Sequence, residues 1–213
     1  MRQAIILIPI FMIFSFCTNK TKEEIFWRWF EKNNFRYLED VDNTLLRESL
    51  FNDIDVELKR VHKELTFEFE PIDKNGCRTL TISADGLKEN FPAVMKLVES
   101  APKIKNWKIN AFRQRVPGDY LEISLGDFKI SYSDIFFKYT EDDTKIGVEL
   151  FIKDYNGTGQ IQNAVYLLFD SLIGEYDTET IISWINWSRL DESETADLLP
   201  FIKLREVIDN KKK

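Results

Sequence analysis

The spacing of apolar residues changes along this chain, and the change marks a switch between helix and strand. Between residues 22 and 61 apolar side chains recur every three or four positions, the period of an amphipathic helix. From residue 64 they alternate with polar ones, as Leu65, Phe67 and Phe69 do, which is the period of a half-buried strand. Further helical and alternating stretches follow. The pattern therefore predicts an α+β fold.

Two helices are expected before the first strand. Thr21 and Glu24 stand three positions apart, the spacing of a capping box, and open a helix over residues 22–38. A second helix is expected over residues 43–61, where leucine and isoleucine recur four apart. The only histidine, His62, follows this helix beside basic residues. There its imidazolium would interact favourably with the negative end of the helix dipole. We therefore expect a structural role for it.

Two later segments share one order of elements. The first has strands over residues 65–70, 78–84 and 107–111, with a helix ending before Pro102 between the last two. The second has strands over 135–140, 147–153 and 178–187, with a helix over 161–173. At an offset of 70 residues Phe67 corresponds to Phe137 and Leu80 to Leu150. The pattern predicts two tandem strand–strand–helix–strand units preceded by two helices, forming an antiparallel-rich sheet with helices on one face.

The remaining segments complete a division of the chain into five parts. Short strands are expected over residues 120–124 and 128–132, and a helix over 193–209. The five parts are an export signal (1–17), a helical segment (18–62), the first unit with the short strands (63–132), the second unit (133–190), and a C-terminal helix and tail (191–213).

The amino end is typical of an export signal. A short basic start precedes the apolar run 4–16, which as a helix would span roughly 20 Å, less than the ~30 Å hydrocarbon core of a bilayer. Cys17 follows this run and resembles the acylated cysteine of a bacterial lipobox, although Phe16 precedes it where glycine, alanine or serine is usual. A conventionally cleaved signal, an uncleaved anchor and a buried first strand are the alternatives.

Composition excludes several classes of partner and site. The net charge is −7, and removing residues 1–16 makes it −8 because only Arg2 is lost. An acidic chain without a local basic face does not favour nucleic acid. One histidine and two cysteines argue against ordinary Cys/His metal sites. If Cys17 is acylated, Cys77 has no intramolecular partner, and no disulfide framework is expected.

Motifs for common reactions are missing from the sequence. It contains neither GxGxxG nor GxxxxGK[ST] for phosphate binding, and no GxSxG nucleophile elbow. Cys77 lies after a turn with no histidine near it in sequence, so it is expected to be a packed or half-exposed thiol. We predict no catalytic residue, cofactor or metal, while two distant carboxylates converging in space would still permit hydrolysis.

Two arginines form the most specific polar pattern. Arg113 and Arg115 continue the period-two spacing of Trp107, Ile109 and Ala111, so both are expected to extend an apolar strand face. A guanidinium pair at the rim of such a face could hold a carboxylate or phosphate ligand. The alternative is pairing with acids at the ends of neighbouring elements, and Asp85 and Glu175 are the candidates.

Several short motifs resemble a family of uncharacterised bacterial proteins, over roughly residues 23–187. They are FWRWF (26–30), ISADG (82–86), FPAV (91–94), AP (101–102), Trp107, AFR (111–113) and LIGE (172–175). The resemblance implies no activity. It singles out Asp85, Gly86, Arg113, Gly174 and Glu175, although the two glycines are equally explained by positive φ angles. With Arg115, these residues give the candidate binding set Asp85, Arg113, Arg115 and Glu175.

These observations favour an exported, lipid-anchored protein of the bacterial cell envelope that acts as a non-catalytic binding module. A protein partner in the envelope is expected, with the membrane reached through Cys17 and no nucleic acid bound. Two other functions stay open: a hydrolase using carboxylates in a cleft between the units, and a cytoplasmic immunity-type inhibitor. Periplasmic or secreted localisation is the corresponding alternative if the signal is simply cleaved.

Overall fold

Two helices open the computed structural model, which describes residues 19–126 and 128–212. Helix α1 (Lys22–Asp40) begins with the expected capping box, in which the Glu24 N–H donates to the Thr21 hydroxyl and the Thr21 N–H donates to the Glu24 carboxylate. Helix α2 (Thr44–Val61) ends at His62, as expected. The predicted leader and Cys17 lie outside the described residues.

The first unit is a three-stranded sheet covered by helices on its apolar face. Strands β1 (Thr66–Phe69) and β2 (Arg78–Ser83) are antiparallel, and β3 (Trp107–Ala111) lies parallel to β2. The 3₁₀ turn η1 (Lys88–Asn90) and helix α3 (Phe91–Glu99) connect β2 to β3. Leu80 and Ile82 of β2 share a core with apolar residues of α1, α2 and α3. The Trp27 indole on α1 donates to the Leu97 carbonyl on α3 over 2.7 Å.

The second unit repeats this order with a longer sheet. It also includes the two short strands that the division by sequence placed with the first unit, because Ile130 lies in its core and Ile123 packs against that core. A hairpin of β4 (Glu122–Leu125) and β5 (Phe128–Ser131) leads through η2 (Tyr132–Asp134) to antiparallel β6 (Ile135–Asp142) and β7 (Lys145–Ile152). Helices α4 (Gly159–Ile173) and α5 (Glu175–Ile181) then lead to β8 (Ile182–Arg189), parallel to β7. Strand β9 (Leu199–Pro200), η3 (Phe201–Lys203) and α6 (Leu204–Lys211) close the chain, and the sheet order is β8-β7-β6-β9.

The two units correspond in topology and in one turn. In each, the first two strands are antiparallel and the strand after the helix is parallel to the second. Asp85 and Asp154 each lie two residues beyond the second strand, with φ angles of 50° and 55°. The single offset of 70 does not extend through the hairpin, since Phe67 pairs with Ile82 whereas Phe137 pairs with Leu150. The α+β class is confirmed.

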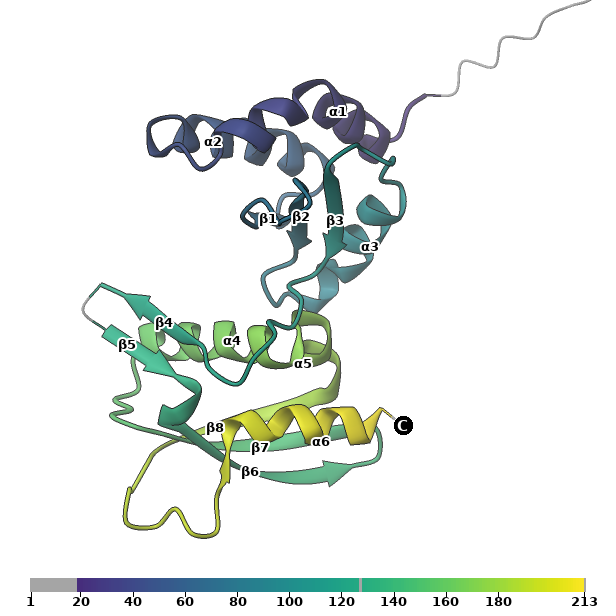
Figure 1. The fold of residues 1–213 in the computed structure, drawn as a ribbon. Helices are drawn as coiled ribbons and strands as arrows, with labels where there is room; N and C mark the ends of the chain where they lie inside the picture. Colours follow the sequence, from purple (N-terminus) through teal and green to yellow (C-terminus); the bar gives the residue numbers. More distant parts are fainter. Residues whose placement is uncertain (1–18, 127, 213) are drawn as a thin grey trace, which may run out of the picture.

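The strands form three sheets within the described residues, which corrects the expectation of one continuous sheet. Each unit encloses its own apolar core, one between Phe26 and Phe112 and the other between Ile130 and Ile208. Figure 1 shows the units one above the other, meeting where α3 approaches the corner between α4 and α5. Phe91 and Phe112 of the first unit contact the Tyr176 ring at that corner.

Two predicted elements were wrong. The first part of the strand expected over 178–187 is helix α5, because Glu175 and Asp177 lie in its first turn, where the helix dipole favours acids. The helix expected over 193–209 forms only from Leu204. Pro200 cannot continue a helix interior, and Asp191 accepts from the Ser193 N–H over 2.9 Å in a local turn that holds the preceding loop.

Candidate functional site

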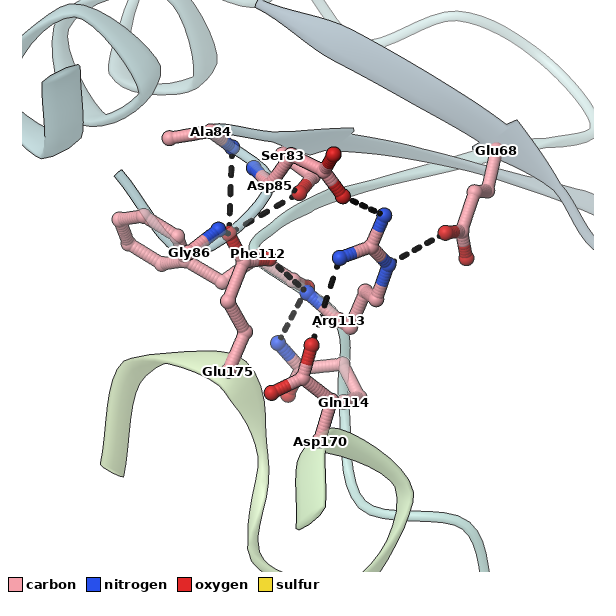
Figure 2. A network of polar contacts seen from close by, with 10 residues as sticks. All are labelled: Glu68, Ser83, Ala84, Asp85, Gly86, Phe112, Arg113, Gln114, Asp170 and Glu175. Atoms are coloured by element: carbon pink, nitrogen blue, oxygen red, sulfur yellow. Dashed lines mark hydrogen bonds and ion pairs between the residues drawn. The ribbon is translucent and has the colours of Figure 1, made fainter. Parts of the chain in front are cut away.

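Glu175 joins the two units through a fully buried carboxylate at the start of α5. Its Oε1 accepts from the Ser83 hydroxyl, the Ala84 N–H and the Gly86 N–H at 2.9, 3.1 and 3.3 Å. Its Oε2 accepts from the Arg113 N–H at 3.0 Å. Figure 2 shows the side chain rising from α5 into the ends of the first sheet. The first unit therefore supplies all four of these donors to the carboxylate.

The left-handed backbone turn after β2 places these donors around the Glu175 carboxylate. Asp85 and Gly86 follow the strand with φ angles of 50° and 77°, so the chain turns sharply there. The Ser83 hydroxyl accepts from the Asp85 N–H at 2.9 Å while donating to Glu175. Successive N–H groups in such a turn form a concavity that suits an anion. Here the anion is a side chain of the same protein.

A second left-handed residue redirects the arginines. Phe112 has a φ of 66° directly after β3, so the strand ends at Ala111. The expectation that Arg113 and Arg115 extend the apolar face of this strand was therefore wrong, because the period-two rule requires continuous extended backbone. Arg113 instead crosses toward the second unit, and its carbonyl accepts from the Glu175 N–H at 3.0 Å.

The Arg113 guanidinium is shared among three carboxylates. Its Nε donates to Glu68, its Nη2 to Asp85 at 2.8 Å and its Nη1 to Asp170 at 3.3 Å (Figure 2). Burial lowers the pKa of Arg113, but the hydrogen bonds and charges of these acids outweigh it and the net pKa is raised. The guanidinium thus stays cationic and connects β1, the turn after β2, and α4.

Asp170 is the most perturbed acid of the site. Its carboxylate lies on α4 and is almost fully buried. Burial raises the pKa of Asp170 to about 7, the Arg113 charge opposes the rise, and the Glu175 charge adds to it. A carboxyl group with this pKa exchanges its proton near neutral pH, which is the range in which general acids and bases operate.

Arg115 takes different partners from Arg113. Its Nη2 donates to Asp177 at 3.0 Å, its Nη1 to Asp209 at 2.6 Å and its Nε to the Ile173 carbonyl at 2.8 Å. The two arginines therefore do not converge on one ligand position. The structure instead shows the alternative in which they pair with acids of the chain: Arg113 forms an ion pair with Asp85 and contacts Glu175 through its main chain.

A cleft of about 500 Å³ opens beside this network, between the units. Its walls are Asp85, Gly86 and Arg113 from the first unit, and Asn163, Tyr166, Leu167, Asp170 and Glu179 from α4 and α5. Burial raises the pKa of Glu179, and the Glu175 charge raises it further. The cleft thus combines carboxylates, one guanidinium that is already paired, and a partly exposed tyrosine ring.

Sequence reasoning missed the acids that complete the site: Glu68, Asp170, Asp177, Glu179 and Asp209. One of them carried a usable signal. Asp170 interrupts the apolar stretch of α4 between Phe169 and Leu172, and a charged residue on a buried helix face requires a partner. The others stand among polar neighbours in the sequence, where an acid carries no such signal, although Asp177 is buried in the structure.

No three His, Cys, Asp or Glu residues are placed to hold a metal ion within residues 19–126 and 128–212. Cys77 is a free, half-buried thiol directly before β2. In the same ranges, no helix combines the length and apolar character needed to cross a membrane.

Comparisons of the sequence with protein-family models and with curated proteins found no match.

Proposed function

We propose that the chain is an exported, lipid-anchored protein of the bacterial envelope that binds a protein partner without catalysing a reaction, and that the inter-unit cleft is its binding face. The observation that carries this proposal is the cleft itself, which both units line. The polar groups behind it are committed to one another: Glu175 to four donors and Arg113 to three acids. These internal bonds hold the walls of the cleft in place, and its surface is then available for contact with a partner.

The charges of the cleft favour a basic group on the partner. Asp85 and Glu179, together with the ionised fraction of Asp170, outnumber the single guanidinium of Arg113, which already donates to Asp85 and Asp170. Tyr166 offers an exposed ring against which a side-chain stem or a guanidinium plane can pack. A lysine or arginine side chain of the partner meets both requirements.

Two small probe molecules, one basic and one acidic, test the cleft. N-acetyl-arginine amide is titrated into the purified protein, with N-acetyl-glutamate amide as the opposite charge, and binding is measured by calorimetry. We expect only the basic probe to bind, and Glu179→Gln to weaken it about tenfold, while Glu194→Gln on an exposed loop leaves it unchanged. Equal binding by the wild type and Glu179→Gln, or no binding of the basic probe, would remove the cleft as the binding face.

The membrane anchor has a separate test. Cells expressing the full chain are labelled with palmitate, and membrane and soluble fractions are compared for the wild type and Cys17→Ala. We expect label and membrane association in the wild type and loss of both in the variant, with Cys77→Ala behaving as the wild type. An unlabelled wild type in the soluble cytoplasmic fraction would instead support the immunity-type inhibitor.

One observation favours a second candidate, a hydrolase that uses carboxylates. Asp170, with its pKa raised to about 7, and Glu179, with its pKa also raised, line the same cleft. Two carboxylic acids in one cleft, with a pKa raised toward neutral in the one that acts as general acid, are the usual arrangement for general acid–base hydrolysis. Hydrolysis of nitrophenyl glycosides, assayed from acidic to neutral pH, tests this candidate. Turnover by the wild type that is lost in Asp170→Asn supports the hydrolase. Equal turnover by the wild type and Asp170→Asn refutes it.

A further inference from the structure

More than half of β6 has no strand beside it on one edge. All eight residues of β6 pair with β7, whereas β9 covers only Phe136 and Phe137 on the opposite edge. Within the described part of the chain, residues 138–142 therefore have a strand neighbour on one side alone. Such an edge presents main-chain N–H and C=O groups that another extended segment can pair with.

A groove of about 700 Å³ lies beside this free edge. Tyr139 and Glu141 of β6 line one side, and Leu199 and Pro200 of β9 close one end. The opposite side is formed by residues at helical spacing on η3 and α6, namely Lys203, Glu206, Val207, Asn210 and Lys211. The groove therefore runs between a strand edge and a helix.

The register of β9 explains why this edge stays open. Leu199 pairs with Phe137, so the residues that would lie opposite 138–142 are those before Leu199, and they form a turn in which the Leu198 N–H donates to the Thr195 carbonyl at 3.1 Å. After Pro200 the chain leaves the sheet and turns through η3 into α6. Leu204 and Ile208 are fully buried and hold α6 against the core. Lys211 binds the Glu141 carboxylate at 3.0 Å, which fixes the far end of the helix near the end of β6. Figure 1 shows α6 running from β9 along the sheet.

We infer that this groove binds an extended peptide segment of a partner protein as an added strand, antiparallel to β6 beside residues 138–142. The short β9 already pairs with β6 in this sense, and the added segment continues its line. Five residues of extended chain span about 17 Å, which matches the free length of β6. Strand addition of this kind draws affinity from main-chain hydrogen bonds and specificity from side-chain pockets.

Side chains around the groove define the segment it accepts. The ion pairs Lys203–Glu206 and Lys211–Glu141 balance most of the charge there. Tyr139 and Leu199 remain partly exposed, at 36% and 39%, and together with Val207 they form an apolar surface. The preferred segment is therefore extended and carries an apolar side chain at alternate positions.

A second copy of the chain fits this edge less well. Pairing two β6 edges would bring the α6 of each copy against the edge of the other, since the helix flanks the same strand. The outer edge of β8 is also unpaired within the described residues, but the β6 groove offers side-chain contacts in addition to main-chain ones. The inferred surface is distinct from the inter-unit cleft, and it does not depend on the proposed function of that cleft.

The test uses random eight-residue peptides displayed on phage and selected on the purified full chain. An enriched peptide is then synthesised, its affinity is measured by fluorescence anisotropy, and its footprint is mapped by amide hydrogen exchange. We expect slowed exchange at residues 138–142. Tyr139→Ala should weaken binding at least tenfold, while Tyr166→Ala, a tyrosine of similar exposure in the cleft, should leave affinity unchanged.

Circular dichroism confirms that each variant is folded, and Val207→Arg serves as a second block from the helix side of the groove. Failure to enrich any peptide, slowed exchange that maps to the cleft or to β8, or unchanged affinity in both groove variants would overturn the inference. Concentration-dependent dimerisation that Tyr139→Ala abolishes would overturn it too, because the occupant of the edge would then be a second copy.

Discussion

Replacing Glu175 by alanine removes the one acceptor that four donors of the first unit share. The Ser83 hydroxyl and the N–H groups of Ala84, Gly86 and Arg113 all donate to this carboxylate. A buried donor left without an acceptor costs about 1–3 kcal/mol. Ser83 and Ala84 are fully buried, whereas Gly86 and Arg113 are partly exposed and water can replace part of what they lose. We therefore expect a loss of about 4 kcal/mol for Glu175→Ala.

The conservative variant and a control sharpen this prediction. Glu175→Gln keeps the oxygen that serves Ser83, Ala84 and Gly86 but turns an amide N–H₂ toward the Arg113 N–H, so about 2 kcal/mol is expected. Glu179→Gln, one turn later on α5, should change the free energy of unfolding by no more than about 0.5 kcal/mol. Urea unfolding of the three variants and the wild type measures each difference. A Glu175→Ala protein within about 1 kcal/mol of the wild type would refute the reasoning.

Three further substitutions have defined outcomes. Burial raises the folded-state pKa of Asp170 to about 7, so the contribution of this residue to stability falls as the pH rises from about 4 to about 7. Urea titrations should therefore show that the free energy of unfolding of Asp170→Asn increases relative to that of the wild type across this pH range. Gly174→Ala should cost about 2 kcal/mol in the same assay, since its φ of 88° with ψ of 143° strains any side chain. Gly147→Ala should lower the melting temperature and raise the exposure of Trp184 to a fluorescence quencher, because the new Cβ would lie 2.0 Å from the indole.

The element order followed from periodicity wherever one face of an element is apolar. Helix α1 and strands β2 and β3 begin at or within a residue of their expected positions, because capping and alternation are local properties. Helix α5 was missed because the β-branched residues Thr178, Thr180 and Ile181 at its end run directly into strand β8 and resemble part of it. Its helical start depends on the acids at its first turn and on the turn at Gly174.

The candidate site was partly predictable. The resemblance and the period-two spacing pointed to Asp85, Arg113 and Glu175, and the structure places these three within one network. Their mutual arrangement could not be foreseen, because Phe112 adopts a left-handed conformation that alternation along a strand does not predict. Asp170 enters the network from a helix 57 positions away in sequence, and such a meeting depends on how the two units dock.

The separation of the two cores has a consequence for how the protein is assembled. All core residues of the first unit precede those of the second, so the first can complete its packing before the second has folded. Until α5 arrives, the donors at Ser83, Ala84 and Gly86 can be met only by water. Docking of the two units is then the last step of folding, and the folding chain passes through a stage in which the first unit is complete while its donors at Ser83, Ala84 and Gly86 have no carboxylate to bind.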